Sequence, residues 1–429
     1  MKSPLFNLNI PRRTAIHLMA SMLSFCQALA SEVAYTTPRG IYTVKVPGTT
    51  PEATQVRTYL GIQLLPDTRF GGRVATVSGN TISFQNFENP TTLADPERKS
   101  YVHVLADSGS GRGFVADIEQ FRATDIVCSE NLVPWIQPWA VVRIRPHPHL
   151  IDLLGATNRF GLGSGTDAET ADNVVVWDPD AQHERVYYFH STRTRWEEKD
   201  IVADAGRAIF RFPYGFYIVR RSPGTLRIAL SGEIGSDAIL LPVRPAGNVF
   251  SLPVNLSASL DKIVRATGDF PIMSGPNAKS ADILTFEEPT TGIQRGPFYH
   301  LSRPGASSWR EVGVNGSSAP IQPLDFLSTL VLRREGNAGH VFVEGSLDPP
   351  PVPIPPLPPN PEPGELPLTA EMPYPRSLPQ SVSLTVETST DLQTWTTYAT
   401  PQFANGKVIF DLPAGQGRAF YRLKATLLE

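Results

Sequence analysis

The chain has 429 residues, of which 41% are hydrophobic and 18% charged, the composition of a globular protein with about two or three domains. Its formal net charge of −3 is mildly acidic. This balance argues against a nucleic-acid partner, because proteins that hold phosphates carry strongly basic surfaces.

Residues 1–30 have the features of a secretion signal. Positive charge at Lys2, Arg12 and Arg13 precedes a mostly apolar run that ends in Ala28-Leu29-Ala30, the small-x-small pattern of a cleavage site. The run is too short and too interrupted for a good membrane span. Removing these residues takes away three positive charges and no acid, which changes −3 to −6. We expect the mature protein to be secreted or held at the cell surface, with no transmembrane span.

The cysteine content excludes a disulfide scaffold. Cys26 leaves with the signal, so Cys128 is the single thiol of the mature chain. Ile126 and Val127 precede it, which predicts a small buried side chain and not a reactive one.

Residues 31–146 predict an N-terminal β-domain built as a small barrel or sandwich. Gly72–Val77 and Thr81–Phe84 flank a Gly-Asn turn and form a hairpin. Tyr101–Leu105 and Phe114–Ile118 flank a Gly/Ser turn, and Ala140–Arg145 closes the series. Short strands at regular spacing with turn signals are typical of such folds.

Residues 147–346 hold a stretch that is written twice, which predicts two repeated β units at 147–255 and 256–346. Phe160–Asp172 matches Phe270–Asp282 at a spacing of 110 residues. Later landmarks return at a spacing of about 113, among them Val219-Arg220-Arg221 as Leu332-Arg333-Arg334. A repeat of this length indicates a duplicated β unit, because solenoid repeats are usually about 20–50 residues long.

Smaller elements are expected within the two units. The segments around His149–Gly155 and Asn255–Val264 are expected to be helical or irregular. Gly215–Val219 and Leu226–Leu230 are expected to form a closing strand pair.

The remaining chain divides into a spacer and a small module. Residues 347–379 form a Pro-rich linker that favours extended polyproline II. Residues 380–429 predict a C-terminal β-module, with alternation at Val382–Val386, a turn at Asn405-Gly406 and a last strand at Phe420–Leu423. A module of about 50 residues has a thin core, so we expect it to pack on a larger domain or a partner.

Trp196 and Trp309 are the candidate binding residues, since each follows an aromatic strand at an equivalent repeat position. They could stack on a ligand, but aromatic residues mainly bury area, and paired core or edge positions are favoured.

Other polar patterns predict no catalytic centre, metal site or bound cofactor. His147-Pro148-His149 lacks the further ligands that zinc needs. Asp178-Pro179-Asp180 is typical of a hairpin turn, and Glu197-Glu198 points to opposite faces of a strand. In each of the pairs Arg220-Arg221 and Arg333-Arg334, one arginine should face solvent on a strand, which favours a solvated edge or an ion pair with Glu233 or Glu335 over an anion site.

The layout resembles an uncharacterised family of secreted β-proteins found mainly in verrucomicrobial bacteria. The resemblance rests on the Gly72–Ile82 hairpin, on Val142–Pro146 and on the two Ala-Asp copies followed by a tyrosine-rich strand and a tryptophan. The tail, Val386–Trp395 with Phe420-Tyr421-Arg422, is similar to a short C-terminal module common on exported proteins of these bacteria. The resemblance implies an all-β exported protein and brings no known activity.

Two functions are the main candidates, and a third hypothesis treats the tail as a sorting or attachment element and the repeats as its passenger. The first is a non-catalytic surface, matrix or adhesion-type protein that binds a glycan or a cell-envelope protein. The alternative is an extracellular polysaccharide hydrolase with an accessory C-terminal module. We favour the first, because no acid, base or nucleophile set converges in the sequence.

Overall fold

The computed structural model confirms an all-β protein, with 56% strand and 3% helix. It describes residues 33–35, 38–62, 64–85, 90–95, 97–105, 111–178, 181–235, 238–252, 272–288, 293–304, 306–313, 329–335, 338–343, 369–373, 382–389, 394–398, 402–404, 407–411 and 418–427. The secretion signal and the segment around Asn255–Val264 lie outside the described residues. Of the two predicted helical or irregular segments, His149–Gly155 contains the short helix α2 (Leu150–Leu154).

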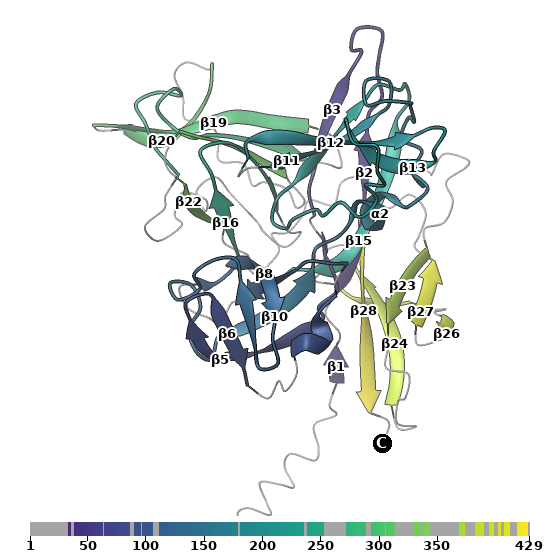
Figure 1. Cartoon of the computed structure of the whole chain (residues 1–429), viewed down its shortest axis with the longest axis vertical. Coiled ribbons are helices and arrows are strands. Elements are labelled where there is room, and N and C mark those ends of the chain that lie inside the picture. Colours follow the sequence, from purple (N-terminus) through teal and green to yellow (C-terminus); the bar gives the residue numbers. More distant parts are fainter. Residues whose placement is uncertain are drawn as a thin grey trace, which may run out of the picture.

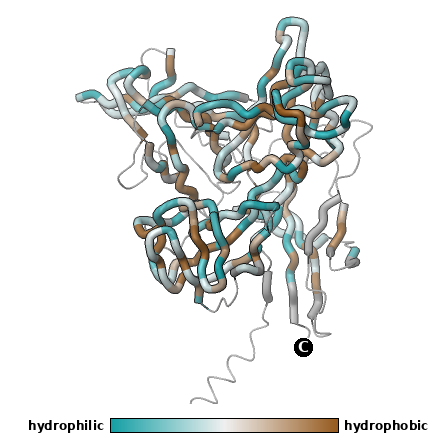
Figure 2. The backbone as a smooth tube through the Cα atoms, viewed as in Figure 1, coloured by the Kyte–Doolittle hydropathy of each residue, from teal (hydrophilic) through white to brown (hydrophobic). Residues whose placement is uncertain are grey.

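The predicted N-terminal hairpins belong to a closed barrel with the strand order β10-β5-β6-β9-β8-β7 (Figure 1). Its strands are β5 (Phe70–Ser78), β6 (Thr81–Phe84), β7 (Ser100–Val104), β8 (Val115–Phe121), β9 (Asp125–Cys128) and β10 (Val141–Pro146). A 3-10 turn, η2 (Pro90–Leu93), precedes β7. Hydrophobic and hydrophilic residues are interspersed along these strands (Figure 2). The buried hydrophobic residues, among them Val74, Ile82 and Val102, form one core cluster in the barrel.

Two five-stranded antiparallel sheets follow, and they have corresponding strand orders. The first sheet runs β13-β12-β11-β14-β3, and the second runs β20-β19-β18-β21-β17. The first consists of β3 (Val56–Leu60), β11 (Asn173–Asp178), β12 (His183–His190), β13 (Arg195–Glu198) and β14 (Phe216–Arg220). The second consists of β17 (Ala246–Ser251), β18 (Ile283–Glu288), β19 (Ile293–Arg303), β20 (Ala306–Glu311) and β21 (Thr329–Arg334).

A seven-stranded sheet, here the terminal sheet, brings the two ends of the chain together. Its main path is β25-β24-β28-β2-β15-β4, and β1 pairs with β28. Its strands are β1 (Val33–Tyr35), β2 (Arg39–Val46), β4 (Leu64–Leu65), β15 (Leu226–Ile234), β24 (Val382–Ser389), β25 (Thr396–Thr397) and β28 (Arg418–Leu427). The expected closing pair of β14 with β15 is wrong, since β14 pairs with β11 and β3 whereas β15 pairs with β2 and β4.

The C-terminal strands pack on the larger body through β28, which pairs with β2 at Gly40↔Phe420. A short sheet of β23 (Thr369–Pro373), β27 (Lys407–Asp411) and β26 (Gln402–Ala404) accompanies them. β23 falls within the last part of the predicted linker, where proline gives way to Thr-Ala-Glu-Met. A further pair, β16 (Ile239–Val243) with β22 (Gly339–Val343), lies between the barrel and the second sheet.

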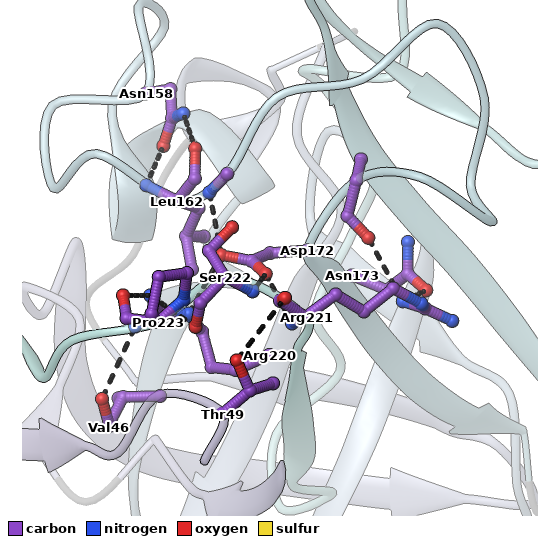
Figure 3. A network of polar contacts seen from close by, with 12 residues as sticks. Val46, Thr49, Asn158, Leu162, Asp172, Asn173, Arg220, Arg221, Ser222 and Pro223 are labelled. Carbon is purple, nitrogen blue, oxygen red and sulfur yellow. Dashed lines mark hydrogen bonds and ion pairs between the residues drawn. The ribbon is translucent and has the colours of Figure 1, made fainter. Parts of the chain in front are cut away.

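Asp172 fixes the turn before β11 to the end of β14 (Figure 3). Its carboxylate accepts hydrogen bonds from the backbone N–H groups of Gly163, Arg221 and Ser222, at 2.6, 2.6 and 3.0 Å. The Arg220 Nε lies 2.8 Å from Asp172 Oδ2, and both side chains are at most 2% exposed. Desolvation makes a buried charge costly, so this pairing holds only in one geometry.

The second sheet has the same arrangement around Asp282. Its carboxylate accepts hydrogen bonds from the N–H groups of Met273 and Glu335, at 2.8 and 2.9 Å, and from the Arg334 guanidinium at 2.5 Å. Arg334 therefore corresponds to Arg220, which is one residue out of step with the sequence alignment of the two arginine pairs. Each pair consists of two arginines, so the sequence alone cannot show whether the alignment of the two strands is shifted by one residue. The strand pairing shows the shift, because Ile218 and Leu332 occupy equivalent positions in β14 and β21.

The solvated-edge interpretation of these arginines is correct for only part of the set. Arg220 and Arg334 are buried or nearly so, whereas Arg333 pairs with Glu335 at 3.0 Å in an exposed setting. Glu233 pairs with Arg145, at 2.7 Å, and ties the barrel to the terminal sheet.

Replacing Asp172 with Ala should destabilise the protein by about 3–5 kcal/mol, because it leaves the Arg220 guanidinium buried without its counter-charge. The free energy of unfolding from urea denaturation measures this. Glu97→Ala is the matched control, since Glu97 and its partner Arg207 form an exposed ion pair and little change is expected. Equal stability of both variants would contradict a stabilising role for the Asp172–Arg220 ion pair.

Glu287 joins the second sheet to the outer edge of β3. Its carboxylate accepts a hydrogen bond from the Tyr59 N–H at 3.0 Å, and the residue is 4% exposed. Burial raises the pKa of Glu287 from the ordinary 4.5 to about 7, although the Tyr59 N–H opposes the shift. This contact between the two sheets is therefore sensitive to pH.

Replacing Glu287 with Gln should remove a pH-dependent loss of stability. Between about pH 4.5 and 7 the folded state binds more protons than the unfolded state, so the contribution of this group falls as pH rises. The free energy of unfolding of Glu287→Gln, measured relative to wild type, should rise by up to about 3 kcal/mol between pH 4.5 and pH 8. Urea denaturation at both values measures the change, and parallel pH dependences would rule the effect out.

Candidate functional site

The two predicted tryptophans are core residues in both sheets. Trp196 is 1% exposed, packs edge-to-face on Phe189 at 5.4 Å, and donates its Nε1–H to the Gly155 carbonyl at 2.8 Å. Trp309 is 3% exposed and meets His300 at 5.4 Å in the same geometry. Their burial matches the favoured core interpretation, and neither ring presents an open face to a ligand.

The histidines of His147-Pro148-His149 make structural contacts within the protein. His147 is fully buried, its Nε2 lies 2.8 Å from Asp117 Oδ1, and its Nδ1 accepts the Phe212 N–H at 3.1 Å. Both ring nitrogens are thus engaged by protein groups. His149 precedes α2, and its backbone N–H donates to Asp152 at 2.8 Å. Among the residues that the structure describes, no group of three His, Cys, Asp or Glu side chains could hold a metal ion.

Two other sequence candidates take ordinary structural places. Asp178 ends β11, and its side chain accepts the Ala181 N–H at 3.0 Å in the turn to β12. Residues 179–180 lie outside the described part of the chain. Glu197 is buried and accepts hydrogen bonds from Arg193 and Arg195.

Cys128 is fully buried, as predicted, and burial raises the pKa of its thiol to about 12. The thiol therefore stays neutral and unreactive.

A depression of about 200 Å³ lies on one face of the first sheet and is the candidate site. Alternate residues of β3, β11, β12 and β14 point into it, because side chains along a strand alternate between the two faces. The loops at 168–169 and 199 complete its rim. Its lining residues are Gln55, Arg57, Ala168, Glu169, Asn173, Val175, Glu184, Val186, Lys199, Tyr217, Val219 and Arg221.

A cationic, an acidic and a phenol side chain lie close together in this depression, with Tyr59 beside them. The Arg57 guanidinium lies over the Tyr217 ring at 4.4 Å, and the Tyr217 hydroxyl donates to Glu184. The phenol of Tyr217 is buried, and this burial raises its pKa above the ordinary range, so it stays a donor. Tyr59 lies beside Tyr217 at a ring distance of 5.2 Å and accepts from Arg57.

Two further pairs form the rim. Lys199 binds Glu169 at 2.7 Å, and the Arg221 guanidinium donates to the Ala171 carbonyl at 3.0 Å. The Lys199 hydrogen bond holds the pKa of Glu169 below its ordinary value. The surface thus offers ionised donors and acceptors close together on a small area.

The second sheet lacks this chemistry at the corresponding ladder positions. Where the first sheet has Arg57, Tyr59 and Tyr217, the second has Gly247, Val249 and Val331. Gly247 is also covered, since Trp177 donates to its carbonyl at 2.6 Å. The polar depression is therefore a feature of the first sheet and not of the shared framework.

The sequence did not reveal this group. Arg57 and Tyr59 lie on a strand about 160 residues before Tyr217, and nothing in either segment announces that they pair. The usable signal is the spacing of two residues between Arg57 and Tyr59, which places both on one face of their strand. Tyr217 shares a face of its own strand with the apolar Val219, so that strand carries no such signal.

Comparisons with protein-family models, curated proteins and solved structures found no match. In the described part of the chain, no helix combines the length and the apolar character needed to span a bilayer. The resemblance to secreted verrucomicrobial proteins stays a prediction.

Trp196→Ala and Trp309→Ala should each lower the free energy of unfolding by about 3–5 kcal/mol, because each leaves a large cavity in a packed hairpin. Chemical denaturation followed by circular dichroism measures the loss. Trp→Phe at each position, which keeps much of the buried ring, should cost less. Unchanged stability combined with lost ligand binding would instead restore the ligand-stacking role.

Proposed function

We propose that this is an exported, non-catalytic binding protein of the surface, matrix or adhesion type, and that the first-sheet depression contacts a hydroxyl-rich ligand such as a glycan. The observation that carries the proposal is the close set of Arg57, Tyr217 and Glu184, with Lys199 and Glu169 at its rim. Export rests on the predicted signal at residues 1–30.

The chemistry of the depression suits sugar hydroxyls. A hydroxyl both donates and accepts, so it can donate to Glu184 or Glu169 while it accepts from Arg57 or Lys199. Hydrogen bonds to ionised groups are stronger than those between neutral groups. Closely spaced charges of opposite sign give no strong preference for a ligand of either charge. This favours a neutral, polyhydroxylated partner over an anion or a cation.

The size of the site favours a part of a larger ligand. Typical small-molecule pockets hold roughly 300–1,000 Å³, and this depression of about 200 Å³ is smaller. One ring or side chain of a polymer fits such a space better than a whole cofactor. A glycan chain or the surface of an envelope protein is therefore the preferred partner class.

The alternative of a polysaccharide hydrolase receives less support from the same residues. Glycoside hydrolysis uses one carboxyl with a raised pKa as the acid and a second carboxylate across the scissile bond. The pKa of Glu169 is lowered by Lys199, which suits an acceptor and not an acid. Glu287 has a raised pKa, but it is buried between the two sheets and does not line the depression.

Arg57→Gln should weaken binding to the best ligand of a cell-wall glycan array by about tenfold or more, because it removes a charge-assisted donor and keeps a polar side chain. Array screening followed by isothermal titration calorimetry measures the affinity. Arg333→Gln is the matched control, since Arg333 is an exposed arginine of the second sheet, paired with Glu335. A wild-type chain that binds no glycan, or two variants that bind equally, would refute the proposal.

A further inference from the structure

The loop between β9 and β10 of the barrel exposes one large aromatic ring. Trp139 is 65% exposed, although Leu132, Ile136 and Ala140 of the same loop are buried. Tryptophan side chains are highly buried on average, so this degree of exposure leaves a large apolar ring in contact with water. This position was not among the sequence candidates, because it lies in a loop without periodic pattern.

The backbone of Trp139 is held in an uncommon conformation. Its φ is +73°, a region that bulky residues rarely occupy and that persists where surrounding contacts impose it. Here its N–H donates to the Val74 carbonyl at 2.7 Å, and its carbonyl accepts from the Arg73 guanidinium at 3.3 Å. Both backbone groups of the residue are therefore fixed to β5.

The rest of the loop is anchored as well. The Leu132 N–H donates to the Gly79 carbonyl at 2.8 Å, and the Trp135 ring stacks on Phe114 at 5.4 Å. Trp135 also contacts His340 of β22, at 4.7 Å. The exposed ring thus stands on a loop that is tied to the barrel at several points, so binding requires little additional ordering of the loop.

We infer that Trp139 is a stacking platform for a sugar ring of a polysaccharide, with Arg73 and Gln137 as flanking hydrogen-bonding groups. The face of a pyranose ring presents C–H groups and its rim presents hydroxyls. The exposed ring lies near the exposed Arg73 guanidinium, and the exposed Gln137 begins the same turn, its carbonyl accepting the Ala140 N–H at 3.1 Å, so both parts of a sugar have a partner of matching chemistry. The inference rests on the proposed function for its ligand class, but it places the contact on the barrel and not on the first sheet.

The surroundings favour a sugar over a membrane. Insertion into a bilayer interface requires a broad apolar face, whereas the Arg73 guanidinium binds the Trp139 carbonyl and the exposed Gln137 belongs to the same turn. Val133, the other strongly exposed apolar residue of the loop, lies six residues earlier and is 55% exposed. It serves as the matched control.

The test is a depletion assay of the full chain on insoluble cellulose, chitin and purified peptidoglycan. Wild type should be retained by at least one of them, and Trp139→Ala should weaken that binding by about tenfold or more. Val133→Ala should change it by less than about twofold. A shift of tryptophan emission on adding soluble fragments of the same polysaccharide should disappear in Trp139→Phe. Equal thermal midpoints of the variants would show that folding is intact.

The inference is overturned by Trp139→Ala binding as tightly as wild type, or by retention of wild type on none of the three polymers. It is also overturned if Trp139 is needed for binding to phosphatidylglycerol vesicles and not to polysaccharide. Arg57→Gln is run in parallel. Loss of binding in Trp139→Ala but not in Arg57→Gln supports the platform and refutes a binding role for the first-sheet depression. Loss of binding in Arg57→Gln but not in Trp139→Ala supports the depression and refutes the platform.

Discussion

The buried ion pair between Asp172 and Arg220 is the constraint on which the arrangement of the sheets depends. The carboxylate is fully buried and receives three backbone N–H groups as well as the guanidinium. Removing two charges from water is costly, and the three N–H groups together with the ion pair offset that cost. Arg220 also reaches the Val46 carbonyl at 3.3 Å, and the Thr49 N–H donates to Ser222. These contacts, here the Asp172 clamp, therefore fix the positions of the turn before β11, the end of β14 and the residues that follow β2 in the terminal sheet.

The same clamp around Asp282 explains how a common framework can carry different surfaces. Its contacts lie at the ends of β18 and β21, away from the residues that point outward from the middle of the sheets. The inward faces of the first, second and terminal sheets share one hydrophobic core, which includes Val174, Leu284 and Ile228. The positions on the opposite faces lie outside both constraints. They are arginine and tyrosine in the first sheet and glycine and valine in the second, where Trp177 covers Gly247.

The sequence predicted local elements well and long-range partners poorly. The hairpin at 72–84 and the barrel strands follow from alternation and turn residues, which act over a few positions, whereas the segment that contains α2 was left open as helical or irregular. Alternation shows that a segment is a strand but not which strand lies next to it, so the pairing of β15 with β2 and of β2 with β28 was not readable. The position of Trp196 was recognised, whereas its burial depends on Gly155 and Phe189 packing around it. Trp139 was missed because its exposure depends on contacts with β5.

The distribution of aromatic residues separates stability from binding. Trp196 and Trp309 are enclosed, so their rings stabilise the core. The exposed Trp139 ring makes no such contribution to stability, and its apolar surface leaves water only when another surface covers it. In the first-sheet depression the charged groups already bind one another, so a ligand exchanges existing hydrogen bonds for new ones and the net gain per contact is small, about 1.5 kcal/mol. Weak single contacts suit a repetitive polymer. When one unit of the polymer is bound, the next contact becomes intramolecular, and its effective concentration can raise the overall affinity about 100-fold or more. Under the proposed function, a small depression and one exposed ring are therefore sufficient for retention on a polysaccharide, without a deep pocket in either place.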